Sequence, residues 1–202
     1  LKQAATYDEL CRDFRWDIPA RFNMATACCD RHADGSGRLA LVYVDEDGGT
    51  TRTSFDEVAD ASRRFANVLT ADGLVRGDRV AVLALNTTDT LEVQFACFRI
   101  GAVFLPLNTR LTIPELRYIT GDASPKVMIH DDDLAETALA VAKLCDVAAT
   151  VRLGPGGAYE AGIAAAKPLE RFEEVTLDDI STIMYTSGTT GQPKGAELMH
   201  RN

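Results

Sequence analysis

The sequence has 202 residues with 46% hydrophobic and 25% charged content, which is typical of a globular protein with a sizeable core. Its formal net charge of −9 argues against a broad basic surface, so we expect no nucleic-acid partner. The longest apolar runs, such as 80–85, fall far short of the roughly 20 residues that a transmembrane helix needs, and no signal peptide opens the chain. We therefore expect no transmembrane segment.

The cysteines are Cys11, Cys28, Cys29, Cys97 and Cys145, an odd number without C-x-x-C spacing. This pattern argues against a disulfide framework and against a zinc site. Cys97 lies in an apolar stretch and is predicted to be a core residue. The composition favours a reducing compartment, and the cytoplasm is the predicted location.

The first predicted elements are a hairpin and a helix. Residues 1–38 show no regular pattern and are predicted to be irregular. Two β-rich segments, 40–44 and 50–55, flank an acidic turn that ends in two glycines, and they predict a β-hairpin. Ser54 and Glu57 have the spacing of a capping box, and apolar residues at helical intervals predict that an amphipathic helix follows.

Strands and helices then alternate along the chain. The segment 79–86 is uniformly apolar, as expected for a strand that is covered on both faces. The alternation predicts a parallel α/β sheet with helices on both faces, which makes three layers. The predicted strands are 79–86, 102–108, 126–131 and 148–154, and the predicted helices between them are 88–101, 112–122 and 133–145.

A Gly- and Ala-rich segment, 154–168, is predicted to form a loop or a weak helix near the surface. Gly154 and Gly156 begin a G-x-G pattern there. Tyr159, however, stands where a dinucleotide-binding fingerprint has its last glycine, which makes the dinucleotide interpretation weak.

A loop rich in hydroxyls and glycines follows a predicted strand at 181–185. Hydroxyls and free amides donate hydrogen bonds to anions, glycines allow close backbone approach, and a lysine ammonium neutralises phosphate charge. We therefore predict that the loop binds a polyphosphate. The residues concerned are Thr186, Ser187, Gly188, Thr189, Thr190, Gly191 and Lys194.

This loop does not match the Walker A pattern, G-x-x-x-x-G-K-[ST]. Counted from Gly188, the second glycine position is Pro193, and the residue after Lys194 is Gly195 instead of Ser or Thr. A nucleophilic role for Ser187 is disfavoured, since the sequence shows no base with an orienting partner for it. No catalytic residue and no metal ligand is assigned within the chain.

The stretch YTSGTTGQPKG, residues 185–195, resembles the signature of the adenylate-forming superfamily. This superfamily includes acyl-CoA synthetases, 4-coumarate-CoA ligases, luciferases and peptide-synthetase adenylation domains. Residues 53–87 and 95–129 resemble the two segments that precede the signature in these enzymes. Residues 195–202 are similar to the continuation, although Glu197 replaces a residue that is usually small and apolar and Met199 replaces the usual Ser or Thr. The resemblance covers nearly the whole chain.

The resemblance implies an α/β fold, namely the three-layer sheet-and-helix N-terminal portion of the adenylate-forming fold, incomplete in this chain. Residues 1–202 would form the N-terminal part of the large AMP-binding domain. The rest of that domain and a C-terminal lid domain with the catalytic lysine would lie beyond residue 202. We therefore expect the chain alone to be inactive, and we expect an unpaired sheet edge to favour a homo-oligomer.

The resemblance also implies a ligase that works in two steps. A carboxylate attacks the α-phosphate of Mg·ATP to give an acyl-adenylate and pyrophosphate, and the thiol of coenzyme A then forms a thioester and releases AMP. The implied partners and cofactors are a fatty acid or related carboxylic acid, ATP, Mg²⁺ and coenzyme A. In this scheme the loop stabilises the charge that develops on the departing pyrophosphate. His200 is a candidate for reaching the substrate pocket, whereas His130, which ends a predicted strand, is predicted to be structural.

Two other interpretations stay open beside this leading one. An adenylation module that loads a carrier protein would use the same loop, but the sequence contains no carrier or condensation segment. A non-catalytic nucleotide-binding or interaction module is disfavoured, because such a module has no physical need for four hydroxyls and a lysine in one loop.

Overall fold

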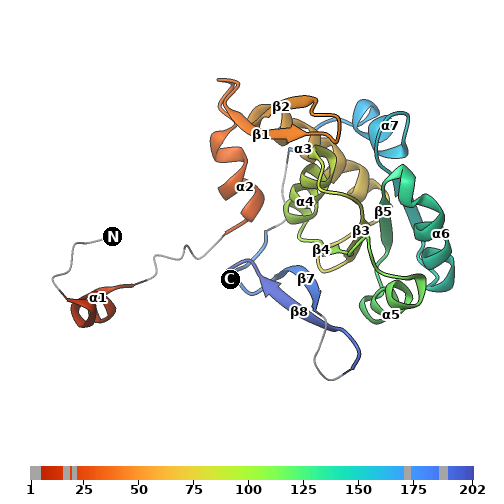
Figure 1. Ribbon diagram of the computed structural model, residues 1–202. Coiled ribbons are helices and arrows are strands. Elements are labelled where there is room, and N and C mark those ends of the chain that lie inside the picture. Colours follow the sequence, from red (N-terminus) through yellow and green to blue (C-terminus); the bar gives the residue numbers. More distant parts are fainter. Residues whose placement is uncertain (1–5, 16–18, 20–21, 171–173, 187–190) are drawn as a thin grey trace.

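A six-stranded sheet forms the centre of the structure (Figure 1). The computed structural model describes residues 6–15, 19, 22–170, 174–186 and 191–202. The strand order is β6-β5-β3-β4-β7-β8. The strands are β3 (Arg79–Leu83), β4 (Val103–Pro106), β5 (Val127–His130), β6 (Ala149–Arg152), β7 (Ile180–Thr186) and β8 (Lys194–Met199).

The predicted parallel sheet is confirmed, and a sixth strand, whose direction was not predicted, joins its edge antiparallel. Strands β3 to β7 pair in parallel, whereas β8 runs antiparallel to β7. Residues 187–193 are the whole connection between β7 and β8. A connection of this length closes a hairpin but is too short for the crossover that a parallel pair requires.

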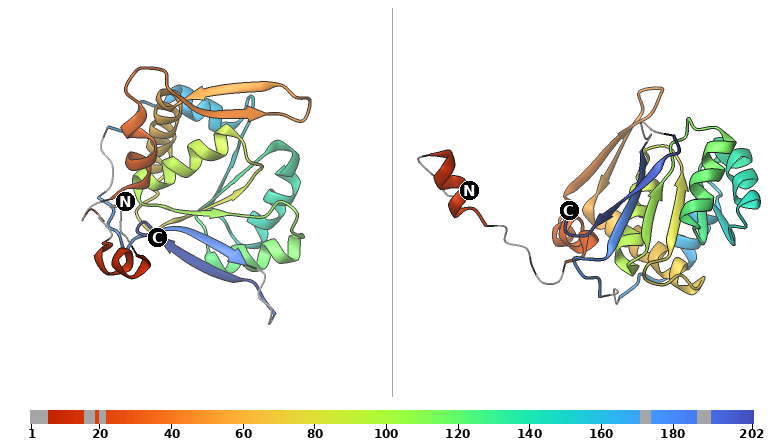
Figure 2. Two further views of the ribbon diagram at one scale, coloured as in Figure 1. Left: turned by 60° about the vertical axis from the view of Figure 1, so that its left-hand side comes forward. Right: turned by 90° about the horizontal axis from the view of Figure 1, so that it is seen from below.

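Helices cover both faces of the sheet, so the predicted three layers are confirmed (Figure 2). Strand β3 shows why its sequence is uniformly apolar. Val80 and Val82 belong to the core on one face, and Ala81 and Leu83 belong to the core on the other. The first face is covered by α3 (Phe55–Ala71), α4 (Thr88–Ile100) and α7 (Ala158–Ala165), and the second by α5 (Ile113–Ala123) and α6 (Ala135–Leu144).

Local sequence signals set the helix ends as predicted. The Ser54 hydroxyl accepts a hydrogen bond from the Glu57 amide at 3.2 Å, and the Glu57 carboxylate accepts one from the Ser54 amide at 2.7 Å. This capping box begins α3. Helix α4 ends at Gly101, whose φ of 68° lies in the left-handed region that glycine adopts without strain.

The predicted hairpin is also confirmed. Strands β1 (Leu39–Val44) and β2 (Thr50–Ser54) pair antiparallel as a separate two-stranded sheet. The Asp45 carboxylate closes the turn by accepting hydrogen bonds from the amides of Asp47 and Gly49 at 3.1 and 2.6 Å.

The prediction of an irregular segment is wrong for the described residues among 1–38. They contain α1 (Tyr7–Asp13), α2 (Met24–Cys28) and the 3-10 turn η1 (Asp30–His32). Asn23 caps α2 by accepting a hydrogen bond from the Ala25 amide at 2.9 Å, and it donates one to the carbonyl of Phe98 at 2.7 Å. A helix as short as α2 is not stable by itself and carries too little periodicity to be predicted, so tertiary contacts of this kind maintain it.

A buried ion pair joins this N-terminal segment to α3 and α4. Arg99 is fully buried, and its guanidinium lies 2.6 Å from the Asp30 carboxylate. The same guanidinium donates to the Ser62 hydroxyl at 3.0 and 3.2 Å, and the second oxygen of Asp30 lies 3.1 Å from Arg63. A charge inside a protein is tolerated only when it is paired and hydrogen-bonded, and here both conditions are met.

The segment 154–168 forms the predicted helix, but one of its residues, Tyr159, is buried instead of lying near the surface. In helix α7 this tyrosine is only 2% exposed and packs on Phe65 with the ring centroids 4.7 Å apart. Its hydroxyl donates to the carboxylate of Glu92 on α4 at 2.5 Å. Burial raises the pKa of Glu92 to about 7, although the hydrogen bond from Tyr159 lowers it. The segment therefore contributes to the core as well as to the surface.

Two single-residue predictions are confirmed. Cys97 is fully buried in the core between the sheet and α4. His130 ends β5, is 3% exposed and forms a 2.9 Å hydrogen bond between its Nδ1 and the backbone oxygen of Asp131, which is a structural role.

Candidate phosphate-binding site

The β7–β8 hairpin carries the predicted phosphate-binding loop at its tip. Thr186 ends β7 and lies opposite Lys194, which begins β8, and both side chains are exposed. Gly191 lies between them with a φ of 131°, a conformation that L side chains rarely adopt. The other predicted residues, Ser187, Gly188, Thr189 and Thr190, lie outside the described residues. We define this pair, Thr186 and Lys194, as the loop mouth. One strand of the hairpin thus provides a hydroxyl and the other an ammonium at the two ends of the loop.

This hairpin turns away from the main sheet. Among the residues that the structure describes, β7 pairs with β4 at one position, Phe104 opposite Thr182. Beyond that position β7 pairs with β8, and the hairpin extends toward α5 (Figure 1). The loop mouth thus lies at the far end of the hairpin, beyond the position at which β7 pairs with β4.

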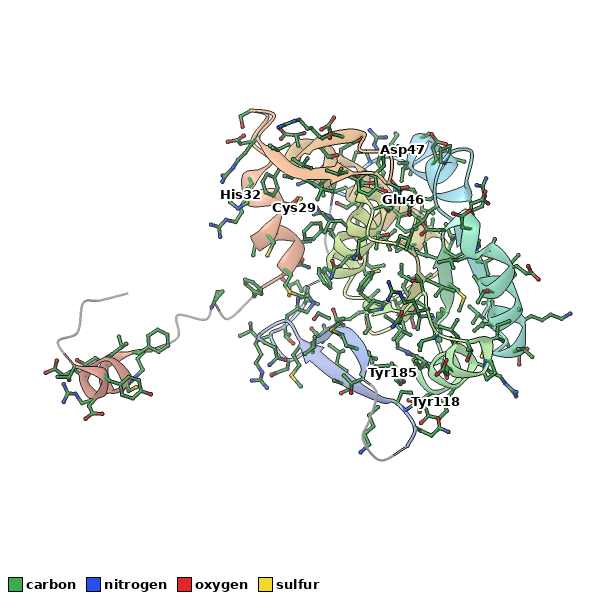
Figure 3. All side chains as sticks on the ribbon, viewed as in Figure 1. Cys29, His32, Glu46, Asp47, Tyr118 and Tyr185 are labelled. Carbon is green, nitrogen blue, oxygen red and sulfur yellow. The ribbon has the colours of Figure 1, made fainter. Side chains whose placement is uncertain are left out.

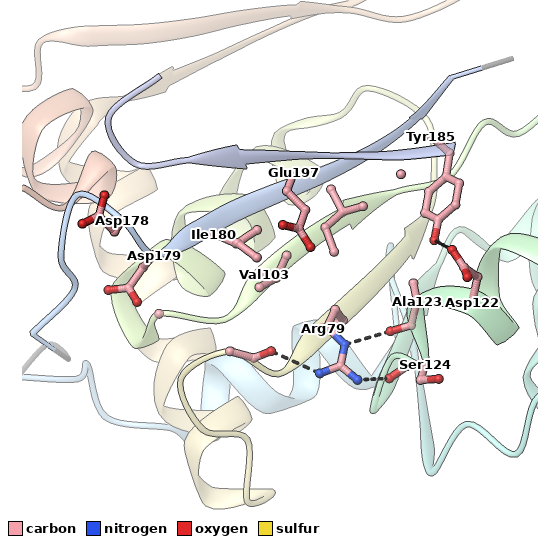
Figure 4. A pocket seen from close by; sticks show the side chains of 14 residues that line it. Arg79, Val103, Asp122, Ala123, Ser124, Asp178, Asp179, Ile180, Tyr185 and Glu197 are labelled. Carbon is pink, nitrogen blue, oxygen red and sulfur yellow. Dashed lines mark hydrogen bonds between the residues drawn. The ribbon is translucent and has the colours of Figure 1, made fainter. Parts of the chain in front are cut away.

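Tyr185, the last residue before the loop mouth, connects the hairpin to α5. Its hydroxyl donates to the Asp122 carboxylate at 2.5 Å (Figure 4). Burial and the neighbouring carboxylate raise the pKa of Tyr185, so the phenol keeps its proton and stays a donor at neutral pH. The sequence analysis did not identify this contact, because 63 positions separate the two residues and no local pattern relates them.

A groove with a volume of about 610 Å³ lies between the hairpin and the amino-terminal ends of β3 and β4 (Figure 4). Its charged lining consists of Arg79, Asp122, Asp178, Asp179 and Glu197. The one cation among them donates hydrogen bonds to the carbonyls that end α5, at 2.7 and 2.8 Å. The carboxylates outnumber this cation even though Asp179 and Asp178 pair with Arg76 and Arg201 at 2.6 and 2.8 Å, so the loop, and not this groove, is the candidate site for an anion.

His200 packs into the protein interior. It is 2% exposed, its ring meets that of Phe98 edge-on at 5.7 Å, and it does not line the groove. Neither ring nitrogen has a hydrogen-bond partner within the described part of the chain. Burial lowers the pKa of His200, so the imidazole is neutral at neutral pH. Its approach to a substrate pocket stays a hypothesis.

The described residues do not assemble a site for a metal ion. Within residues 6–202, leaving aside the four undescribed segments there, no group of three or more His, Cys, Asp or Glu side chains could hold one. The Mg²⁺ implied by the sequence resemblance stays an expectation, and we derive no step through such a site. None of the described helices combines the length and the apolar character needed to cross a bilayer.

Comparison with known proteins identifies the family. The family described as AMP-binding enzyme matches residues 29–202, which is most of the chain. The chain belongs to the AMP-binding enzyme family. The family match therefore agrees with the resemblance of residues 185–195 to the adenylate-forming signature.

Individual proteins are similar to this chain in sequence and in fold. A feruloyl-CoA synthase from Amycolatopsis sp. is 44% identical over 157 residues, which cover 77% of this chain and 30% of the relative. The crystal structure of an acyl-CoA synthetase from Brucella canis matches 96% of this chain and 38% of its own with a TM-score of 0.86 at 26% identity. ATP-bound MatB from Rhodopseudomonas palustris matches 89% of this chain and 35% of its own with a TM-score of 0.76 at 36% identity. The chain spans about a third of the length of the relatives it matches.

Proposed function

We propose that this chain supplies the phosphate-binding loop of an AMP-forming acid–thiol ligase, an acyl-CoA synthetase that activates a fatty acid or related carboxylic acid with ATP. The observation that carries the proposal is the hairpin that sets Thr186 and Lys194 across one loop mouth. Membership of the AMP-binding enzyme family supports it, as do relatives that are named as CoA synthases and synthetases. ATP as substrate is supported by the fold shared with the ATP-bound MatB structure.

In the proposed reaction a carboxylate oxygen bonds to the α-phosphorus of ATP, and the bond to the bridging oxygen of pyrophosphate breaks. Negative charge then grows on the departing pyrophosphate. Hydroxyls, loop amides and the Lys194 ammonium stabilise that charge most when they are fixed before the reaction. In the second step the sulfur of coenzyme A bonds to the acyl carbon, AMP leaves and the thiol proton is released. The proposed phosphate-binding residues are Thr186, Ser187, Gly188, Thr189, Thr190, Gly191 and Lys194.

The Lys194→Ala substitution tests this assignment in an enzyme of the full length of the relatives. We expect carboxylate-dependent ATP–pyrophosphate exchange to fall about 100-fold, because a charged group that stabilises the leaving pyrophosphate is lost. The control is Lys143→Ala, which removes an exposed lysine on α6. Exchange rates that stay equal in both variants would contradict the loop assignment. Thr189→Ala provides a second, uncharged test of the same loop.

We propose that residues 1–202 form the N-terminal part of the large AMP-binding domain and that the remaining catalytic groups come from the other two thirds of an enzyme of the relatives' length. The short coverage of those relatives supports this division. The chain alone is therefore expected to show no ATP–pyrophosphate exchange. Measurable carboxylate-dependent exchange by the purified 202-residue chain would refute that expectation. We further propose that the outer edge of β8, at the end of the strand order, favours self-association, which sedimentation of the same sample tests.

The acid substrate and the acceptor thiol are proposed only as classes, a carboxylic acid and coenzyme A. Exchange assays with fatty, aryl and amino acids, followed by a test of coenzyme A against a carrier protein, distinguish these choices. A full-length enzyme that loads only a carrier protein would favour the adenylation module instead. We place the enzyme in the cytoplasm, which the free state of all five cysteines supports.

A further inference from the structure

The end of β7 is held by two different parts of the molecule. Tyr185 pairs across the hairpin with Gly195, the residue that follows Lys194. Its hydroxyl reaches in another direction to Asp122, at the end of α5 (Figure 4). Tyr185 and Gly195 directly adjoin the two residues of the loop mouth, one on each strand. A contact made by this tyrosine therefore acts on both sides of the mouth.

Gly195 has a steric role and not a conformational one. A Cβ atom built on it would lie 3.1 and 3.2 Å from the Cζ and Cε2 atoms of Tyr185 and 3.0 Å from Cγ2 of Ile183. Its φ does not lie in the left-handed region. The tyrosine ring thus lies across the space that a side chain at position 195 would fill. Absence of that side chain lets the ring cross the neighbouring strand and reach α5.

Asp122 is attached to a well-fixed part of the fold. Leu116 and Ile119 of α5 are 0% and 2% exposed and belong to the core on their face of the sheet. The Arg79 guanidinium, from β3, donates to the carbonyls of Ala123 and Ser124 at 2.8 and 2.7 Å. These contacts hold the end of α5 against the sheet. Past Thr182, the described part of β7 has no pairing with β4. The hydrogen bond from Tyr185 to Asp122 therefore anchors the tip of the hairpin to this fixed end of α5.

We propose that Tyr185 and Asp122 are positioning residues that hold Thr186 and Lys194 where they meet the phosphates of ATP. We name this pair the hairpin clamp. This inference rests on the proposed function, because the clamp has a role only if the loop binds the phosphates of ATP. Neither residue touches the nucleotide in this scheme; they act through the loop mouth. Fixing charged and donor groups before the substrate binds lowers the cost of ordering them during binding and reaction.

The Tyr185→Phe variant of the full-length enzyme is the primary test, because it keeps the ring over Gly195 and removes only the hydroxyl. We expect the KM for ATP in the exchange assay to rise about tenfold, the effect of one lost hydrogen bond on loop order. Asp122→Ala is expected to give the same rise, and the double variant no further rise. Asp122→Asn, whose side-chain oxygen still accepts, is expected to retain most of the affinity. Tyr118→Phe is the matched control, since Tyr118 is an exposed tyrosine on α5 near Tyr185 (Figure 3).

The outcomes separate the clamp from the proposed function. Wild-type KM in Tyr185→Phe, together with loss of exchange in Lys194→Ala, overturns the clamp and leaves the function intact. Wild-type exchange in Lys194→Ala overturns the loop assignment, and with it the clamp, whereas absence of carboxylate-dependent exchange in the original full-length enzyme overturns the proposed function. A loss of Tm in Tyr185→Phe with an unchanged KM also overturns the clamp, because it shows a role in stability alone.

A second measurement uses the 202-residue chain itself. Hydrogen–deuterium exchange of the hairpin, 180–199, is expected to be about tenfold faster in Tyr185→Phe and in Asp122→Ala, and unchanged in Tyr118→Phe. Gly195→Ala is expected to accelerate exchange as well, since its new methyl group displaces the ring. Equal exchange in all these variants and in the original chain would overturn the clamp without any assay of activity.

Discussion

Replacing Asp30 with alanine is expected to lower the free energy of unfolding by about 3–5 kcal/mol. The change removes the carboxylate that lies 2.6 Å from the fully buried guanidinium of Arg99. A buried charge that loses its partner keeps the cost of desolvation without the compensating attraction. Arg63 loses the same carboxylate at 3.1 Å, so η1 loses its ion pairs to both α3 and α4, whereas the hydrogen bond from Asn23 to Phe98 remains.

Urea denaturation of the chain measures this effect. The matched control is Asp60→Ala, which removes an exposed carboxylate paired with Arg64 at 2.7 Å and is expected to cost about 0.5 kcal/mol or less. The double variant Asp30→Leu/Arg99→Met replaces both charges with apolar groups and should be less destabilised than Asp30→Ala. Equal losses for Asp30→Ala and Asp60→Ala would show that burial does not strengthen this ion pair.

The second large expected effect is a dependence of stability on pH that arises from Glu92. This carboxyl group is 7% exposed, and burial raises its pKa from 4.5 to about 7. The folded protein therefore binds the proton more tightly than the unfolded chain does. The resulting stabilisation is fully present below pH 4.5 and is lost as the pH rises through about 7, and it amounts to about 3 kcal/mol.

Comparison with Glu92→Gln isolates this contribution, because glutamine does not titrate. Between pH 4.5 and 8, the original chain is expected to lose about 3 kcal/mol of unfolding free energy relative to the Glu92→Gln variant. Glu136→Gln, on the exposed side of α6, serves as the control and is expected to leave the pH profile unchanged. A difference that is constant with pH would mean that Glu92 has the same proton affinity in both states.

The sequence predicted the elements whose signals are local. The capping box of Ser54 and Glu57, the glycine that ends α4 and the apolar run of β3 each set an element without reference to distant residues. Helix α2 was missed because its stability depends on Asn23 and on contacts with α4, more than 70 positions away. The burial of Tyr159 was missed for the same reason, since its partner Glu92 lies 67 positions earlier.

The candidate site likewise has a part that local sequence signals predicted and a part that depends on distant residues. Its motif was visible because a short run of hydroxyls, glycines and one lysine carries its chemistry in consecutive residues, and the strand that leads into it was predicted. The contact between Tyr185 and Asp122 was invisible because it depends on how the hairpin lies beside α5. Gly195 was noted as a mismatch to the Walker A pattern and as part of the signature, whereas the ring of Tyr185 on the adjacent strand gives the steric reason for a glycine there.

The contacts of the N-terminal segment decide where this chain can be shortened. Helix α1 contributes no buried residue, whereas Asn23 and Asp30 bond to α4 and thereby secure α2 and η1. A cut just before Asn23 spares these bonds. Trimming the chain to the matched family segment, 29–202, would instead remove Asn23 and α2 and leave Asp30 close to a new free end. The structural boundary of this unit thus lies before the start of the family match.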